Sequence, residues 1–448
     1  MRSRVDNSQL IMPFSLSREQ VWRPIHYLGS KLRLTESIRE LLAELDPTCG
    51  TVCDLFAGSG TVALALSSDR NVVAADIQEY SRVLCTALLQ PAALDKPTID
   101  GLIQHAERSE FRKRLRRCLE PILDFEQEAV DAATSKPQAL CDLVERGSLL
   151  ASHDGRDSLS LALHETRSRI ESEAVAGRLM ASRYFGGIYF SFAQTLFIDC
   201  VLDAIDRLST TVKDTCLAAL LSTASSIVST IGKQFAQPIR PRCRDGTIKQ
   251  HLIRQMCRDR CQNAYEVFAG WLSRYQELPK GGFHRVIRGD YREVLSQLND
   301  VSIIYADPPY TRDHYSRFYH VLETLCLRDS PDISTTLLNG EGATSRGLYR
   351  TDRHQSPFCI KSQAPRAFGE LFAGSRELGV PLLLSYSPFI RDGHPRLMTV
   401  EAVAKLAGEY YREVEVVPAG RIAHSKLNKT ELHLDASYSA EVLIMCRT

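Results

Sequence analysis

The sequence predicts an α/β protein in which a mostly parallel sheet of seven strands is covered by helices on both faces. Two groups of short apolar segments, bounded by turn residues, have the length and composition of strands. Segments with helical periodicity stand between most of them, and strands that alternate with helices usually pair in parallel. A long stretch between the two groups has almost no strand pattern, which indicates a helical insertion.

The expected elements follow in chain order. Strands are expected at 51–54, 71–75, 284–289, 301–306, 380–385, 412–418 and 440–446. Helices between strands are expected at 35–45, 61–67, 291–298 and 402–411, and helices of the insertion at 103–119, 158–182, 190–208, 217–231 and 250–278. This pattern divides the chain into an N-terminal part of the α/β domain (1–90), the insertion (91–283) and a C-terminal part of the α/β domain (284–448).

Composition is that of a globular protein, since 44% of the 448 residues are hydrophobic and 24% are charged. No stretch approaches the roughly 18 uncharged apolar residues of a membrane span, and the N-terminus lacks the apolar core of a signal peptide. The 13 cysteines have no tight spacing, which is typical of reduced cytoplasmic thiols. We therefore expect a cytoplasmic protein with no membrane contact and no metal site.

A glycine-containing turn follows the first expected strand, in the segment Asp54-Leu55-Phe56-Ala57-Gly58-Ser59-Gly60-Thr61. Glycines at a strand-to-helix turn let the backbone approach a ligand closely. Asp76 ends the next strand, and an acidic residue there can accept hydrogen bonds from ribose hydroxyls. Together these features indicate an adenosine-containing cofactor. The spacing of Gly58, Gly60 and Ala63 also fits a dinucleotide fingerprint, so a dehydrogenase is an alternative at this point.

A second unusual corner, Asp307-Pro308-Pro309-Tyr310, follows the strand expected at 301–306. Two prolines fix φ and supply no backbone N–H, and each restricts the residue before it to extended conformations. The corner therefore holds one carboxylate and one aromatic ring rigidly at the end of a strand.

The combination of the two corners resembles the amino-group DNA methyltransferases, which use S-adenosylmethionine and carry a phenylalanine-x-glycine-x-glycine loop and a DPPY corner. The loop is 56–60 here, it comes before the corner, and the DPPY form is typical of the adenine-modifying branch. The segment Tyr27-Leu28-Gly29-Ser30-Lys31 is similar to the opening segment of Dam-like DNA adenine methylases, in which a second glycine takes the place of Ser30. The resemblance covers about 1–90 and 284–448 and implies the Rossmann-like sheet of class I S-adenosylmethionine-dependent methyltransferases.

The resemblance implies an enzyme, a site-specific DNA adenine-N6 methyltransferase acting on double-stranded DNA. Adenine lies inside the duplex and its amine is a weak nucleophile, so the base must be flipped out and its nitrogen activated. Asp307 and the carbonyl of Pro308 would accept the two amine hydrogens, Pro309 would keep the corner rigid, and Tyr310 would stack on the base.

Cofactor contacts are also implied by the resemblance. Asp76 would bind the ribose, Asp290 the adenine amine of the cofactor, and Tyr27 and Lys31 the methionine end. The full set of expected cofactor-binding residues is Tyr27, Lys31, Asp54, Phe56, Ala57, Gly58, Gly60, Asp76 and Asp290.

Basic residues cluster locally although the net charge is only +1. The densest run lies within 238–262, in the insertion that would carry target recognition, and basic loops occur at 347–354 and 421–429. For 311–320, a loop over the flipped base and a core-packed helix are both compatible with the pattern. The residues expected to contact DNA are Arg240, Arg242, Arg244, Tyr315, Arg317, Arg350 and Arg353.

Alternatives to this function are left open by the sequence. One is the same chemistry on RNA, although RNA adenine methylases more often carry asparagine at the first position of the corner. Another is a non-catalytic DNA-binding defence component that keeps the fold. The family setting is restriction–modification or phage defence, in which a cognate restriction or defence subunit would be a further partner.

Overall fold

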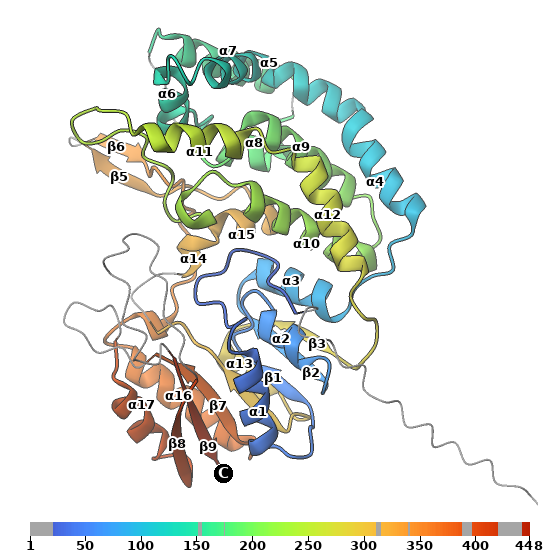
Figure 1. Ribbon diagram of the computed structural model, residues 1–448, viewed down its shortest axis with the longest axis vertical. Coiled ribbons are helices and arrows are strands. Elements are labelled where there is room, and N and C mark those ends of the chain that lie inside the picture. Colours follow the sequence, from blue (N-terminus) through green and yellow to red (C-terminus); the bar gives the residue numbers. More distant parts are fainter. Residues whose placement is uncertain are drawn as a thin grey trace, which may run out of the picture.

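The computed structural model describes residues 21–150, 155–173, 175–310, 315–338, 341–387, 397–419 and 441–448. They form an α/β part, built on a central sheet, and a helical part that lies above it in Figure 1. The basic segment expected at 421–429 lies outside the described residues. Within the described residues, no helix is both long enough and apolar enough to cross a membrane.

The central sheet has the strand order β3-β2-β1-β4-β7-β9-β8. Its strands are β1 (Val52–Asp54), β2 (Val72–Asp76), β3 (Arg285–Arg288), β4 (Ile303–Ala306), β7 (Leu382–Tyr386), β8 (Glu413–Pro418) and β9 (Val442–Arg447). The strands from β3 to β7 are parallel, and β9 runs antiparallel to both β7 and β8. All seven expected strands are present, so the predicted mostly parallel sheet is confirmed.

Helices cover both faces of this sheet, and the central strands are therefore apolar on both sides. In β4, Ile303 and Tyr305 pack in one apolar cluster, while Ile304 and Ala306 pack in the cluster on the opposite face. The first face is covered by α1 (Thr35–Leu45), α2 (Thr61–Leu66) and α3 (Glu79–Leu89), and the second by α13 (Tyr291–Gln297), α16 (Ala364–Glu377) and α17 (Val400–Ala407). The sequence analysis missed α3 and α16.

The helical part is built mainly from the insertion. Its helices are α4 (Lys96–Arg108), α5 (Glu110–Asp131), α6 (Gln138–Arg146), α7 (Ser158–Ser172), α8 (Met180–Phe185), α9 (Phe192–Ile205), α10 (Thr210–Ile227), α11 (Gln250–Arg260) and α12 (Ala264–Gln276). Two of the expected helices are each split in two by a capping residue. Ser109 accepts a hydrogen bond from the Arg112 N–H and starts α5, and Asn263 starts α12 in the same way.

The segment that follows the DPPY corner returns to the helical part. It contains α14 (Tyr315–Phe318) and α15 (His320–Leu327), so the helical interpretation of this stretch is correct for the described residues. A hairpin of β5 (Thr335–Leu338) and β6 (Glu341–Thr344), which the sequence analysis missed, comes next. One apolar core runs from α3 through α9 and α10 to α15, and it joins the two parts of the molecule.

A buried ion pair fixes three segments of the helical part to one another. The Arg260 side chain is 1% exposed, pairs with Glu126 of α5, and donates a hydrogen bond to the Gly187 carbonyl. Glu126 also accepts a hydrogen bond from the Phe192 N–H at 2.5 Å, at the start of α9. Burial raises the pKa of Glu126 although Arg260 opposes that shift, so the carboxylate depends on its partner.

Replacing Arg260→Met is expected to lower the free energy of unfolding by about 3–5 kcal/mol, because it leaves Glu126 buried without a counter-ion. Urea unfolding followed by circular dichroism would measure the change. Arg258→Met is the matched control, since Arg258 lies on the same helix with its side chain 70% exposed, and its effect should stay within about 0.5 kcal/mol. Equal unfolding midpoints for the two variants would contradict this role of the pair.

Candidate active site

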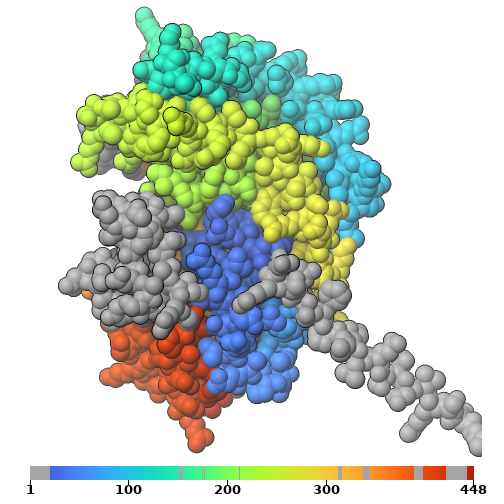
Figure 2. Space-filling model, in the orientation of Figure 1, coloured from blue at the N-terminus to red at the C-terminus, as the bar shows by residue number. Residues whose placement is uncertain are grey.

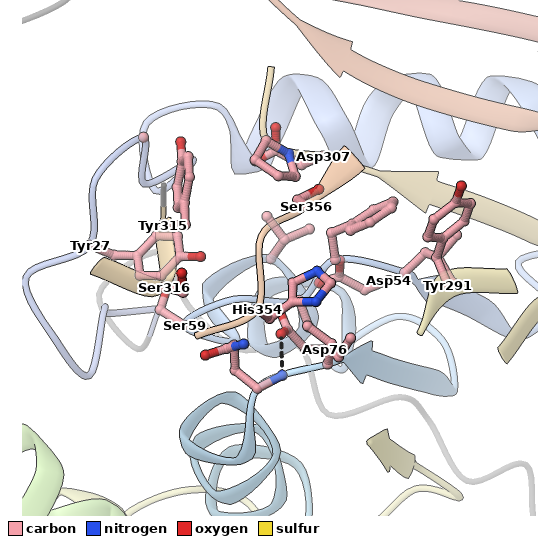
Figure 3. Close-up of a pocket in the computed structure, with 18 of the residues that line it drawn as sticks. Tyr27, Asp54, Ser59, Asp76, Tyr291, Asp307, Tyr315, Ser316, His354 and Ser356 are labelled. Atoms are coloured by element: carbon pink, nitrogen blue, oxygen red, sulfur yellow. Dashed lines mark hydrogen bonds between the residues drawn. The ribbon is translucent and has the colours of Figure 1, made fainter. Parts of the chain in front are cut away.

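A pocket opens at the carboxyl ends of β1, β2 and β4, which is where parallel sheets place their ligands (Figure 3). Three segments far apart in the sequence contribute to it: the segment around Tyr27, the glycine turn after β1, and the DPPY corner after β4. The pocket therefore brings together the motifs on which the sequence interpretation depends. The expected site residues that line it are Tyr27, Lys31, Asp54, Phe56, Ala57, Asp76, Asp290, Asp307, Pro309 and Tyr315.

Gly58 and Gly60 shape the turn beneath this pocket rather than line it. Both have left-handed backbones, with φ of +53° and +74°. A Cβ at Gly58 would lie 2.5 Å from the Tyr27 hydroxyl oxygen, and one at Gly60 would lie 2.7 Å from a methyl of Leu88. Glycine is therefore required at both positions, so that the turn fits between the Tyr27 segment and α3.

Asp76 is held in place by the backbone of the same region. Its carboxylate accepts hydrogen bonds from the N–H groups of Gly58 and Gln78, both at 2.9 Å. Burial raises its pKa, and these two hydrogen bonds oppose the shift. The two fixed donors orient the carboxylate into the pocket, where Figure 3 shows it beside His354.

Asp54 has the fewest polar contacts of the carboxyl groups in the site. It lines the pocket at the end of β1, and its two carboxylate oxygens are buried without a close hydrogen-bond partner among the described residues. Burial, followed by the charges of Asp307 and Asp76, raises its pKa to about 8. A carboxylate in this position suits a cationic or N–H-donating ligand group.

At the DPPY corner, Asp307 pairs with Lys31 instead of facing the pocket alone. The Lys31 Nζ lies 2.9 Å from Oδ2 of Asp307 and 3.4 Å from Oε1 of Glu441. Burial raises the pKa of Asp307 to about 6, with Lys31 opposing and Glu441 reinforcing the shift. Burial lowers the pKa of Lys31, but Asp307 and Glu441 outweigh it, and the ammonium stays charged.

Tyr310 lies behind Asp307 and is 5% exposed. Its hydroxyl donates a hydrogen bond to Glu441 at 2.7 Å, and its ring packs against Tyr386 with the ring centroids 5.1 Å apart. It does not line the pocket, whereas Tyr315 does. Tyr315 in turn lies next to Tyr27, whose ring is stacked on Tyr319 with centroids 4.8 Å apart.

Asp290 and His354 line the pocket on the side of Asp76. Asp290 starts α13, where its carboxylate accepts hydrogen bonds from the backbone N–H of Arg292 and from its guanidinium, at 3.1 and 2.8 Å. Burial lowers the pKa of His354, and Asp290 and Asp76 oppose the shift. His354 belongs to the basic loop that the sequence analysis assigned to DNA contact. Other pocket residues that the sequence analysis missed include Ser59, Gln78, Tyr80, Tyr305, Ser316 and Ser356.

The arginines expected to contact DNA fall into two groups. Arg242 pairs with Asp142 and Glu145, and Arg350, whose side chain is 4% exposed, pairs with Asp329 and Asp352. Since their charges are compensated within the protein, these two arginines are poor candidates for phosphate contact. This outcome corrects the expectation for Arg350 in particular, because it is buried.

The second group lacks carboxylate partners among the described residues. The guanidinium groups of Arg317 and Arg353 lie over the ring of Tyr349, 4.6 and 5.2 Å from its centroid. Arg240 and Arg244 are exposed and lie in the segment before α11, which projects at the left of Figure 2. Arg317 and Arg353 directly follow and precede pocket residues, Ser316 and His354. In the part of the chain that the structure describes, positive charge without a carboxylate partner therefore lies next to pocket residues.

Comparisons with known proteins agree with this geometry. Residues 27–135 match the family model of the D12 class N6 adenine-specific DNA methyltransferases. Over 364 residues the chain is 22% identical to the modification methylase LlaI of Lactococcus lactis subsp. lactis, covering 81% of this chain and 46% of that protein. The chain thus spans about half the length of the curated relative it matches. The matched family region contains Tyr27, Lys31, the glycine turn and Asp76.

Replacing Asp54→Asn is expected to stabilise the protein increasingly as pH rises. The folded state holds the Asp54 proton up to about pH 8, whereas the unfolded chain releases it near pH 4, so the wild type loses stability between these values. The variant should gain about 5 kcal/mol over the wild type between pH 4 and pH 8, at about 1.4 kcal/mol per pH unit. Urea unfolding at several pH values would measure the difference.

Asp300→Asn is the control for this prediction, because Asp300 is exposed on the loop before β4. A difference between Asp54→Asn and the wild type that does not change with pH would contradict the assignment of a raised pKa to Asp54.

Proposed function

We propose that this chain, which is similar to adenine-specific DNA methyltransferases, transfers a methyl group from S-adenosylmethionine to N6 of adenine in double-stranded DNA. The observation that carries the proposal is the presence of the glycine turn, Asp76 and Asp307 around one pocket. Either motif alone has other interpretations, but a glycine turn and a DPPY carboxylate in one pocket are the combination on which the resemblance to amino-group methyltransferases depends.

The residues of the pocket fit this cofactor. S-adenosylmethionine supplies, when bound, an activated methyl group on a positively charged sulfur. Asp76 accepts hydrogen bonds from ribose hydroxyls and Asp290 from the adenine amine, and Asp54, whose oxygens lack a close partner among the described residues, would ionise beside a cationic methionine end and accept its N–H groups. Tyr27, Phe56 and Ala57 form apolar walls, and Gly58 and Gly60 keep the turn open. Lys31 was expected at the methionine end, and in the structure its ammonium pairs with Asp307 of the corner.

The corner activates the target amine. The Asp307 carboxylate and the Pro308 carbonyl accept the two amine hydrogens, which draws the nitrogen towards tetrahedral geometry and frees its lone pair for attack. The two prolines fix these acceptors, so little reorganisation is needed during the reaction. Tyr310 supports the flipped base by stacking, and Tyr315 is a second aromatic ring on the pocket side of the corner.

DNA would lie along the border between the helical and α/β parts. Arg317, Arg353, Arg240 and Arg244 are the candidates for phosphate contact, because no described carboxylate neutralises them. In this proposal, 1–90 and 284–448 form the catalytic domain and the insertion 91–283 reads the target sequence. A setting in restriction–modification or phage defence, in the cytoplasm and with a cognate subunit, is favoured by the relative's name as a modification methylase.

The decisive experiment is methyl transfer from labelled S-adenosylmethionine to unmodified plasmid DNA, with duplex RNA alongside. We expect N6-methyladenine in the DNA, and Asp307→Ala should lower kcat/KM by about 10²–10⁴-fold because the amine loses its fixed acceptor. Asp300→Ala, an exposed aspartate near the same strand, should retain full activity. Label in RNA alone would identify a different substrate, and failure to bind the cofactor would refute the proposal.

The DNA contacts predict a change in salt dependence. Arg317→Ala and Arg353→Ala should each weaken binding of nonspecific DNA and lower the slope of log K against log salt concentration by about 0.9, one phosphate contact each. Fluorescence anisotropy at several salt concentrations would measure the slopes. Arg366→Ala, on α16 with its side chain 83% exposed, is the control, and equal slopes for all three variants would remove these arginines from the interface.

A further inference from the structure

Lys31 makes the two contacts that the proposed function assigns to the target adenine. Its ammonium is an N–H donor 2.9 Å from the Asp307 carboxylate, and it lies over the Tyr310 ring, 5.7 Å from the ring centroid. A flipped adenine would need the same carboxylate for its amine and the same ring for its base. The ion pair between Lys31 and Asp307 therefore has to break when the amine binds to Asp307.

A second carboxylate stands within reach of the same ammonium. Oε1 of Glu441 lies 3.4 Å from the Lys31 Nζ and accepts the Tyr310 hydroxyl hydrogen bond at 2.7 Å. The other oxygen, Oε2, accepts a hydrogen bond from the Ser385 hydroxyl at 3.5 Å. Glu441 is 5% exposed and directly precedes β9, next to β7 in the sheet, so its position is fixed by the sheet.

We propose that Glu441 is the carboxylate that receives Lys31 when the adenine amine takes Asp307, and that Lys31 exchanges between the two carboxylates in each catalytic cycle. This inference rests on the proposed function, and it makes Glu441 a positioning residue, because Glu441 acts through Lys31 and Tyr310 and not on the reacting atoms.

Charge balance supports the exchange. Lys31, Asp307 and Glu441 together carry one positive and two negative charges, so one carboxylate is available to another donor whichever one Lys31 selects. An ammonium buried at 5% exposure is costly without a counter-ion. Since both carboxylates are within hydrogen-bond reach of the Lys31 Nζ, the ammonium can leave Asp307 without losing ionic contact.

The hydrogen bond from Tyr310 links this exchange to base stacking. The Tyr310 ring is the proposed stacking surface, and its hydroxyl is held by the carboxylate that would receive Lys31. Glu441 therefore orients the Tyr310 ring. It also binds the Lys31 ammonium when that ammonium leaves Asp307. The titratable groups that face Asp307 are Lys31, Glu441, Asp54, Tyr305, Tyr310 and Tyr315.

The test is the pH dependence of kcat/KM for DNA methylation in Glu441→Gln, with Glu441→Asp and the wild type. The wild type should lose activity as pH falls through about 6, because Asp307 must be ionised to accept the amine. Removing the negative charge of Glu441 lowers the pKa of Asp307, so the acid limb of Glu441→Gln should move to lower pH. Its plateau kcat/KM should fall roughly tenfold, since Lys31 has no charged alternative to Asp307.

Glu441→Asp keeps the charge and should keep the acid limb of the wild type. Glu415→Gln is the matched control, because Glu415 is exposed on β8, the neighbour of β9, and it should behave as the wild type in every respect. Calorimetric binding of S-adenosylmethionine to Glu441→Gln should be unchanged, which would show that the variant is folded.

Three outcomes would overturn the inference. An unshifted acid limb in Glu441→Gln, with reduced activity, would reduce Glu441 to a structural role. Unchanged activity and pH dependence in Glu441→Gln would also overturn it. If Lys31→Met in addition bound the cofactor more weakly, Lys31 would move to the cofactor instead of to Glu441. If the wild type formed no methyladenine, the proposed function itself would fail, and the exchange with it.

Discussion

The candidate active site depends on the parallel pairing of β1 and β4, two strands separated by the entire helical insertion. Asp54 lies opposite Tyr305 in this register, so the glycine turn and the DPPY corner leave the sheet at the same edge. The parallel pairing of β2 with β1 brings Asp76 to that edge too. Because carboxyl ends of parallel strands converge on one side of a sheet, three carboxylates from distant segments meet in a single pocket.

This convergence concentrates carboxyl groups in a buried site. The Lys31 ammonium pairs with Asp307 and Glu441, whereas Asp54 and Asp76 have no such ion pair among the described residues, and burial raises the pKa of the three aspartates. Burying these carboxyl groups costs free energy in the protein without ligands. A cationic cofactor and an N–H-donating substrate would offset that cost when they bind. The carboxyl groups of the site therefore suit the cationic methyl donor and the amine of the proposed reaction.

Sequence reasoning succeeded where local composition determines structure. Buried parallel strands such as β4 and β7 appear as short apolar runs, and both corners carry glycine or proline signals that few other structures require. It could not foresee the ion pair of Lys31 with Asp307 or the role of Glu441, because these depend on contacts across the whole chain. A basic residue also gives no sign of its partner: Arg350 resembled a DNA contact in the sequence and is buried between two aspartates.

Aromatic packing connects the helical part with the glycine turn after β1. Tyr27, against which Gly58 is fitted, stacks on Tyr319, and Tyr319 belongs to the apolar core that extends through α9 and α10. The Tyr319 hydroxyl also accepts the N–H of Leu28 at 2.6 Å, which fixes the segment leading to Lys31. A displacement of the helical part against the sheet would therefore move Tyr27, which lines the candidate site, and the segment leading to Lys31 together. In the proposed enzyme, engagement of DNA by the insertion and clearance of the catalytic carboxylate would depend on the same contacts.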